Sequence, residues 1–372
     1  APPPPPRPQP LPEQDNADAP GLPRWLVPTG AGGLALVALL MWSPWNQGGS
    51  AQEEVPAAPS TDPAAPATQA TDALPDARSL AASSRAPVLA SGQAPSAFQA
   101  FRDCADCVEM VALPGGTFRM GDDASDEPDE KPARDVRLSA FAISRYPVTR
   151  GEYAAFVAAT GRATSGGCYT DRATRGSWAA DPQGTWRDPA FSQTDRHPVV
   201  CVDTGDAEAF AAWMSQRTGR SYRLVSEVQY EYANRGGTRG QYFWGDSSEG
   251  ACYFANGGDA TFKRAVPSIS WATLACSDGF ERTSPVGSFQ ANPFGLYDST
   301  GNVWSWTRDC YVNTYSAAGT NDPVNTTSGC ANRVFRGGSW NDDPALLRSA
   351  NRLRYAPTGR YGVVGFRLAR TL

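Results

Sequence analysis

The sequence predicts one α+β domain with little regular secondary structure over residues 101–372, preceded by segments that cannot form a core. Residues 1–24 are rich in proline, and residues 46–100 consist mainly of Ala, Pro, Ser, Thr, Asp and Gln, with hardly any aromatic side chains. Segments of this composition bury too little apolar surface to offset the entropy lost on ordering, so both are expected to be disordered. From Phe101 onward the chain is rich in Trp, Tyr, Phe and Gly and is long enough for one substantial core.

Residues 25–45 are predicted to form a transmembrane helix. No charged residue lies between Arg24 and Glu53, and the apolar stretch is long enough to cross a bilayer. A cleaved signal peptide is the alternative, but no small-x-small cleavage site follows the stretch directly. Arg7 and Arg24 precede the span and acidic residues follow it, so the positive-inside rule places residues 1–24 in the cytoplasm. The expected location is the bacterial inner membrane, with a single pass and a periplasmic or extracellular C-terminal domain.

The charge pattern argues against one class of partner. The net charge is −5, and the Lys and Arg residues are scattered among Asp and Glu without forming a basic stripe. Nucleic acid is therefore not expected as a partner.

All eight cysteines lie in the predicted domain, and an even number in an oxidising compartment indicates disulfides. A zinc site is the alternative for Cys104 and Cys107, but no second Cys-x-x-Cys or histidine pair is present to complete it. The sequence does not fix the connectivity. The pairing that closes the shortest loops joins Cys104 to Cys107, Cys168 to Cys201, Cys252 to Cys276 and Cys310 to Cys330.

The first part of the domain has the pattern of strands. Residues 110–121 contain two short apolar runs separated by Pro-Gly-Gly, which predicts a strand, a turn and a second strand. The charged segment 122–134 is expected to be a loop, and residues 136–143 are again typical of a strand.

Three helices should follow. Thr149, with a glutamate three residues later, forms a capping box that predicts a helix over residues 150–160. A second helix is expected from Thr204 to its glycine stop at Gly219, and Ser226 caps a third, shorter helix. The rest of the chain offers mainly Gly, Asn, Asp, aromatic residues and short apolar runs, which predicts loops held by a few strands.

Short motifs are spread in order over the whole domain. They are Leu113-Pro-Gly-Gly-Thr-Phe-Arg-Met-Gly121, Tyr146-Pro-Val-Thr149, His197-Pro-Val-Val200, Tyr222-Arg-Leu224 with Tyr230-Glu-Tyr-Ala233, Phe243-Trp-Gly245, Pro285-Val-Gly-Ser-Phe289, Phe294-Gly-Leu-Tyr297, Gly301-Asn-Val-Trp304, Val334-Phe-Arg-Gly-Gly-Ser-Trp340 and Gly365-Phe-Arg367. On these motifs the domain resembles the formylglycine-generating enzyme, or sulfatase-modifying factor, family, whose fold is a large, irregular variant of the C-type lectin fold.

The resemblance implies two redox chemistries, and the ligands of both are missing. Active enzymes of the family hold copper with two cysteines shortly after the Gly-Gly-Ser-aromatic motif, whereas this chain has no cysteine from Ala331 to Leu372. Relatives that form sulfoxides use iron held by three histidines, and His197 is the single histidine here. We therefore expect neither copper nor iron. His197, which precedes Pro198 and two valines, is interpreted as a structural residue and not as a base.

The resemblance also implies structural calcium. The segments that supply one site in the family match here through the side chains of Asn256 and Asp278 and the carbonyls of Gly257 and Phe280. Hard oxygen ligands of this kind suit Ca²⁺. The alternative is a pair of tight turns that pack without metal. A second site is less expected, because Ser305 stands where the family has a glutamate.

The segment that follows Gly338 mixes aromatic, short polar and arginine side chains on predicted loops, which is typical of a recognition surface. The alternative is that Arg348, Arg352, Arg360 and Arg367 hold these loops to carbonyls and carboxylates. The expected ligand-binding residues are Trp340, Asn341, Asp342, Asp343, Leu347, Leu353, Tyr355 and Tyr361.

Two functions are compatible with these residues. The first is a membrane-anchored domain that binds an unknown protein or small-molecule ligand; its tail also resembles the variable region of retroelement-diversified proteins with the same fold. The second is an oxidoreductase of the sulfatase-modifying factor type that acts on a peptide or amino-acid substrate. No nucleophile, base or metal set is recognisable, and Asp342 with Asp343 is interpreted as a solvated or ligand-facing pair. Binding is therefore the leading hypothesis.

Overall fold

The structure is a computed structural model that describes residues 85–372, except 91, 164–165, 316–318 and 328. The predicted cytoplasmic segment 1–24 and the predicted transmembrane span 25–45 lie outside the described residues. Over the described ranges, no helix is both long enough and apolar enough to cross a membrane.

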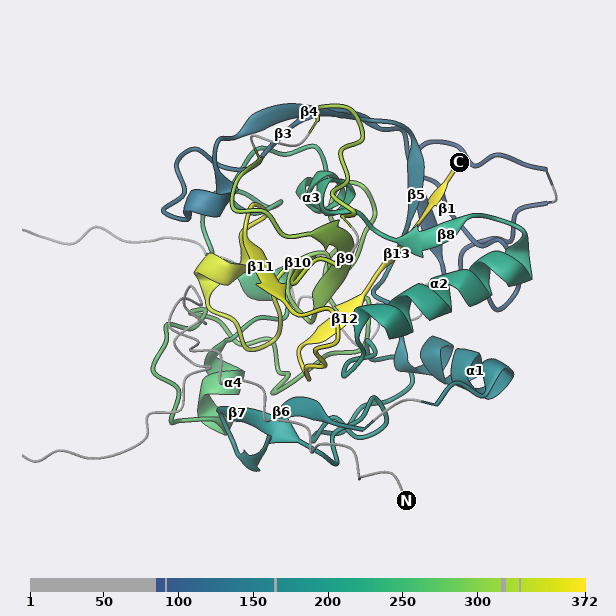
Figure 1. The fold of residues 1–372 in the computed structure, drawn as a ribbon. Coiled ribbons are helices and arrows are strands. Elements are labelled where there is room, and N and C mark those ends of the chain that lie inside the picture. The colour runs from purple at the N-terminus through teal and green to yellow at the C-terminus, as the bar shows by residue number, and fades with distance from the viewer. Residues whose placement is uncertain (1–84, 91, 164–165, 316–318, 328) are drawn as a thin grey trace, which may run out of the picture.

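The first sheet has five strands in the order β1–β2–β5–β13–β8, and each strand is antiparallel to its neighbours. The last strand of the chain, β13, is an interior strand of this sheet and lies between β5 and β8 (Figure 1). The strands span Ala100–Phe101 (β1), Met110–Leu113 (β2), Phe141–Ser144 (β5), Tyr222–Leu224 (β8) and Leu368–Thr371 (β13).

A second sheet of four strands lies at the centre of the molecule, in the order β11–β10–β9–β12 (Figure 1). Its strands are β9 (Trp304–Cys310), β10 (Arg333–Arg336), β11 (Arg352–Tyr355) and β12 (Val364–Phe366), and β12 runs parallel to β9. Two hairpins complete the strands: β3 (Gly116–Met120) with β4 (Arg134–Leu138), and β6 (Cys168–Thr174) with β7 (Ser177–Asp181).

All three predicted helices form, and two of them start at the predicted caps. The helix α1 (Arg150–Thr160) starts with the Thr149 capping box, and α3 (Glu227–Arg235) starts with that of Ser226. The helix α2 (Thr204–Thr218) is capped by Asp203 and ends at Gly219, whose left-handed backbone suits glycine. The sequence missed one short helix and three 3₁₀ turns: α4 (Ala260–Ala265), η3 (Pro128–Glu130), η4 (Ala251–Tyr253) and η6 (Pro344–Leu347).

The main core joins the α1–α2 layer to the central sheet. Tyr153 and Phe156 of α1 pack against Phe210 of α2 with ring centroids 6.2 and 5.4 Å apart. Phe210 also meets Phe366 of β12, so the helices and the sheet share one aromatic cluster. Burying rings of this size supplies much of the stabilising apolar area.

All four disulfides have the predicted connectivity. The structure pairs Cys104 with Cys107, Cys168 with Cys201, Cys252 with Cys276 and Cys310 with Cys330. The pairing of Cys104 with Cys107 also excludes the zinc alternative in this state, because neither thiolate is free to bind a metal.

The N-terminal boundary of the folded region differs from the predicted one. Composition assigned residues 46–100 to a linker, yet Ala86 is buried and Val88 pairs with Arg102 as an isolated bridge. The segment from residue 86 is therefore held on the domain by a few specific contacts that its composition does not reveal.

Buried ion pairs fix α3 against the central sheet. Glu231 of α3 binds Arg336 of β10 and Arg235, and Glu227 binds Arg352 of β11 at 2.6 and 3.0 Å. All five residues are at most 6 % exposed. A buried charge without its partner is strongly destabilising. The pair of Glu227 with Arg352 therefore holds β11 in place against α3.

Candidate functional site

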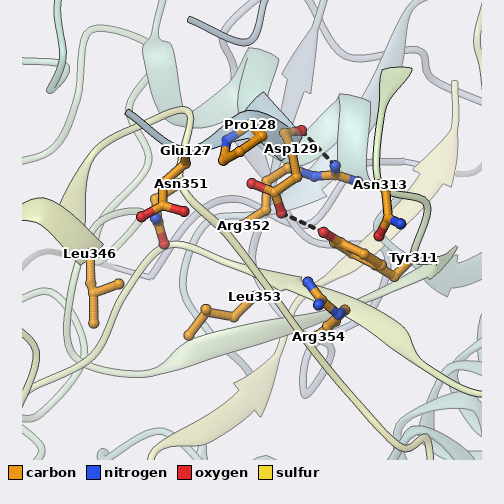
Figure 2. A pocket seen from close by; sticks show the side chains of 10 residues that line it. All are labelled: Glu127, Pro128, Asp129, Tyr311, Asn313, Leu346, Asn351, Arg352, Leu353 and Arg354. Carbon is orange, nitrogen blue, oxygen red and sulfur yellow. Dashed lines mark hydrogen bonds between the residues drawn. The ribbon is translucent and has the colours of Figure 1, made fainter. Parts of the chain in front are cut away.

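A cleft of about 570 Å³ opens above β11 (Figure 2). It brings together the η3 turn, the start of the loop after β9, and the segment that leads into β11. Its lining residues are Glu127, Pro128, Asp129, Tyr311, Asn313, Leu346, Asn351, Arg352, Leu353 and Arg354.

Two arginine side chains hold the η3 turn, which forms one wall of the cleft. Arg348 holds Glu130 through two hydrogen bonds of 2.7 Å, and Arg352 donates to the carbonyl of Asp129 at 2.8 Å. Tyr311 donates its hydroxyl proton to Asp129 Oδ2 at 2.7 Å across the cleft (Figure 2). The turn is therefore a rigid part of the site, although the sequence predicted only a charged loop there.

A carboxylate and a guanidinium that line the cleft do not form an ion pair with each other. Glu127 and Arg354 form no ion pair with any described residue, and Arg354 lies over the Tyr311 ring at 4.1 Å. Burial, and then the charges of Asp129 and Glu130, raise the pKa of Glu127. The cleft thus offers carboxylates at one side and a guanidinium at the other to a bound molecule.

A small aromatic cavity of about 20 Å³, enough for roughly one water molecule, lies beneath Leu353, which also lines the cleft. Tyr355 stacks on Phe335 at 5.3 Å and meets Tyr361 at 4.8 Å. The Tyr355 hydroxyl is buried without a hydrogen-bond partner among the described residues. The other lining residues are Trp178, Trp304, Val363 and Val364.

Asp342 is a buried carboxyl group close to this cavity. Its Oδ2 accepts hydrogen bonds of 2.7 Å from both the backbone N–H and the hydroxyl of Ser339. Its Oδ1 has no hydrogen bond of normal geometry within the described part, and the Trp304 side chain is a polar neighbour. Burial, with a smaller contribution from the Asp343 charge, raises the pKa of Asp342 to about 7.

The predicted recognition surface is only partly a surface. Trp340, Asn341, Asp342 and Leu347 are at most 1 % exposed, which corrects the interpretation of Asp342 as solvated. The turn closes inward because Ser339 binds Asp342. Trp340 packs against Trp178, Phe191 and Phe262 at 5.5–5.8 Å.

The other predicted ligand-binding residues are more accessible. Asp343 caps η6 by accepting from Leu346 N at 3.1 Å, while Leu353, Tyr355 and Tyr361 are partly buried and meet at the aromatic cavity. Sequence reasoning missed Glu127, Asp129 and Tyr311, since nothing local places them opposite β11.

The alternative reading of the arginines is confirmed: each holds a loop. Arg348 binds Glu130, Arg352 binds Glu227, and Arg360 binds Asp203 and Asp206 at 2.6 and 2.9 Å. Arg367 donates to the carbonyls of Ser144 and Tyr297.

The predicted calcium ligands fit a hard cation. Asn256 Oδ1 and Asp278 Oδ2 are both buried and lack a hydrogen-bond partner among the described residues. Phe280 N donates to Asp278 Oδ1 at 2.7 Å, so the matching segment turns tightly around this carboxyl. Burial chiefly raises the pKa of Asp278 to about 8. No group of three acidic, Cys or His side chains that suits a metal occurs in the described part. The carbonyls of Gly257 and Phe280 as further ligands remain a prediction from the resemblance.

The residues after Ser339 do not fit copper, because every cysteine of the chain is in a disulfide. His197 is partly buried, and its Nδ1 lies 2.9 Å from Thr283 Oγ1. Burial, followed by the Arg150 charge, lowers the pKa of His197 to about 4.

Comparison with known proteins agrees with this architecture. The family model described as the sulfatase-modifying factor enzyme 1-like domain matches residues 97–372. The formylglycine-generating enzyme of Thermomonospora curvata is 36% identical over 295 residues, covering 70% of this chain and 92% of that protein. The protein named inactive C-alpha-formylglycine-generating enzyme 2 from Bos taurus is 32% identical over 294 residues, covering 70% of this chain and 88% of that protein.

Among solved structures, PvdO from Pseudomonas aeruginosa is 37% identical with a TM-score of 0.62, and the match covers 75% of this chain and all of PvdO. Since the family model covers most of the chain, the chain belongs to the sulfatase-modifying factor enzyme 1-like family, with its C-type lectin-like fold.

Proposed function

We propose that this protein is a ligand-binding member of its family that lacks the copper oxidase site. One observation carries the proposal: all eight cysteines are consumed in disulfides, and residues 341–347 offer no sulfur atom to a soft metal. The relative named inactive in Bos taurus supports it, because family membership does not by itself imply the oxidase.

The ligand of the proposed site is a peptide or small molecule that carries both charges. Glu127 and Asp129 suit a cationic group, Arg354 suits a carboxylate, and Leu353 offers apolar contact between them. The rigid η3 wall reduces the ordering cost of binding.

A thermal-shift screen of the protein against charged peptides and free amino acids tests the binding function. Compounds that bind the wild-type protein should bind the Arg354→Glu variant at least about tenfold more weakly. The substitution reverses the charge at this position, so attraction of the ligand carboxylate becomes repulsion. Arg220→Glu is the control, because Arg220 is exposed just beyond α2. Equal losses in both variants, or hits unaffected by Arg354→Glu, would reject the cleft as the site.

Copper reconstitution tests the missing oxidase site. After incubation with Cu(I) and gel filtration, we expect less than about one-tenth of an equivalent of bound copper, because a site without thiolates holds Cu(I) weakly. Stoichiometric tight copper would overturn the proposal.

A second candidate is an enzyme acting on a peptide or amino-acid substrate. The observation that favours it is Asp342, a buried carboxyl group whose pKa of about 7 is a property of a general acid or base. Turnover of an amino-acid or peptide substrate that Asp342→Asn abolishes, with binding retained, would favour this candidate.

The proposal also includes a membrane anchor and a structural calcium ion. Residues 25–45 would hold the domain at the bacterial inner membrane, and the four disulfides are consistent with an extracytoplasmic domain. Calcium would support the fold at Asn256 and Asp278. A retroelement-diversified tail is the further alternative, and a near-copy repeat beside a reverse-transcriptase gene would establish it.

A further inference from the structure

The four disulfides differ in the charge that surrounds their sulfur atoms. Arg217 Nη2 lies 3.8 Å from Cys104 Sγ. By contrast, Cys168 Sγ and Cys310 Sγ lie 3.6 and 3.2 Å from carbonyl oxygens, and Cys252 Sγ lies 4.0 Å from a carboxylate oxygen of Asp259. A cation that attracts a thiolate therefore lies beside Cys104, whereas the polar atoms that contact Cys168, Cys252 and Cys310 are oxygen atoms, which do not attract one.

The Cys104–Cys107 bridge is also asymmetric in exposure. Cys107 is fully buried, Cys104 is partly exposed, and Ala105 and Asp106 between them are exposed. Solvent therefore reaches part of Cys104 and none of Cys107.

This bridge contributes least to holding the fold. Its cysteines are 3 residues apart, against 33, 24 and 20 for the other pairs. Because a short loop constrains the unfolded chain least, the bridge can open while the domain stays folded.

The remaining charges near Cys104 do not cancel the guanidinium. Asp103 is neutralised by Arg370 at 2.8 Å and accepts the Tyr222 hydroxyl, while Arg102 donates to the carbonyls of Ala86 and Ala105. Asp106 is exposed, and screening by solvent weakens its effect. Arg217 itself is positioned over the Trp213 ring at 4.8 Å.

We propose that Cys104–Cys107 is a site of thiol–disulfide exchange with an external thiol, independent of the ligand cleft. The thiolate attacks Cys104 Sγ and forms a mixed disulfide; the Cys104–Cys107 bond breaks, and its electron pair leaves on Cys107, which takes a proton from water. A second thiolate attacks the external sulfur and releases Cys104 as a thiolate that Arg217 stabilises. Two external thiols become one disulfide, and the protein gains two electrons; the reverse reaction reduces a disulfide.

The test follows each cysteine pair of the full chain in reduced glutathione, with N-ethylmaleimide trapping and mass spectrometry. We expect the Cys104–Cys107 bridge to open at least about tenfold faster than any other pair, measured as alkylation of Cys104, because the partly exposed cysteine next to a cation reacts first. Opening of Cys252–Cys276 at the same rate would overturn the proposal.

Variants of the exposed Arg217 separate the role of charge from that of the short loop. Arg217→Gln should slow opening about threefold or more and Arg217→Lys should restore it, since the positive charge attracts the thiolate. Arg220→Gln, an exposed neighbour, is the control and should leave the rate unchanged. A wild-type rate in Arg217→Gln would refute the electrostatic mechanism and the site with it.

Discussion

At the scale of single residues, burial decides the chemistry of the acidic groups. Asp342 and Asp309 are both buried, and burial raises the pKa of each to about 7. Asp309 accepts from the backbone N–H groups of Glu227 and Asn325, so it ties the start of α3 to the loop after β9. Neither environment can be read from the local sequence.

These raised pKa values predict that stability falls as the pH rises. The folded state holds a proton on Asp342 that the unfolded chain releases near pH 4, so the stabilisation is present below pH 4 and is lost as the pH rises to about 7. Asp342→Asn should remove up to about 1.4 kcal/mol per pH unit of this dependence. Urea unfolding at pH 4 to 8 measures it, and an unchanged slope would show that Asp342 is ionised in the fold.

Calcium should act through Asp278 and Asn256. Calcium at 100 times its Kd should stabilise the fold by about 2.7 kcal/mol, because it binds only the folded state. Asp278→Asn should abolish this shift in thermal unfolding, whereas Glu249→Gln, at an exposed carboxylate, should retain it. The alternative of metal-free turns would be correct if calcium leaves the wild-type Tm unchanged.

At the scale of elements, ion pairs and not apolar contacts hold α3 on the central sheet. Glu231 has no exposed surface and binds two arginines from different elements. The pairs also position Arg352 beneath the cleft, because its guanidinium binds both Glu227 and the Asp129 carbonyl. The cleft therefore depends on a network that lies outside it.

Glu231→Ala should destabilise the protein by about 3–5 kcal/mol, because it leaves Arg336 buried without its carboxylate. Glu208→Ala is the matched control: its pair with Arg333 at 3.3 Å is half exposed and should cost less than about 1 kcal/mol. Chemical denaturation measures both. Similar values for the two variants would mean that water replaces Glu231 inside the network.

At the scale of the whole molecule, the disulfides and the return of the C-terminal strand hold long loops together. The strand β13 pairs with β5 and β8, which are distant in sequence, and Cys168–Cys201 ties the β6–β7 hairpin to the chain before α2. In a domain with so few long elements, such links tie together segments that are distant in sequence.

Removing Cys168–Cys201 by alanine substitution should cost about 4 kcal/mol, whereas removing Cys104–Cys107 should cost about 1.5 kcal/mol, from the loop entropy each restores to the unfolded chain. The free energy of unfolding of the two double variants gives the comparison. A larger loss for the short bridge would mean that it is structural.

The sequence by itself determined the family and the three helices, because each depends on signals that lie within a few residues or on ordered motifs. It favoured, without fixing, the disulfide pairing that the structure shows. Only the tertiary structure decided that residues 340–342 and Leu347 turn inward and that η3 faces β11 across the cleft. The physical reason is range: a cap or a short loop is set by neighbouring backbone groups. Burial and a cleft wall depend on contacts such as Arg352 with Asp129, which are 223 residues apart.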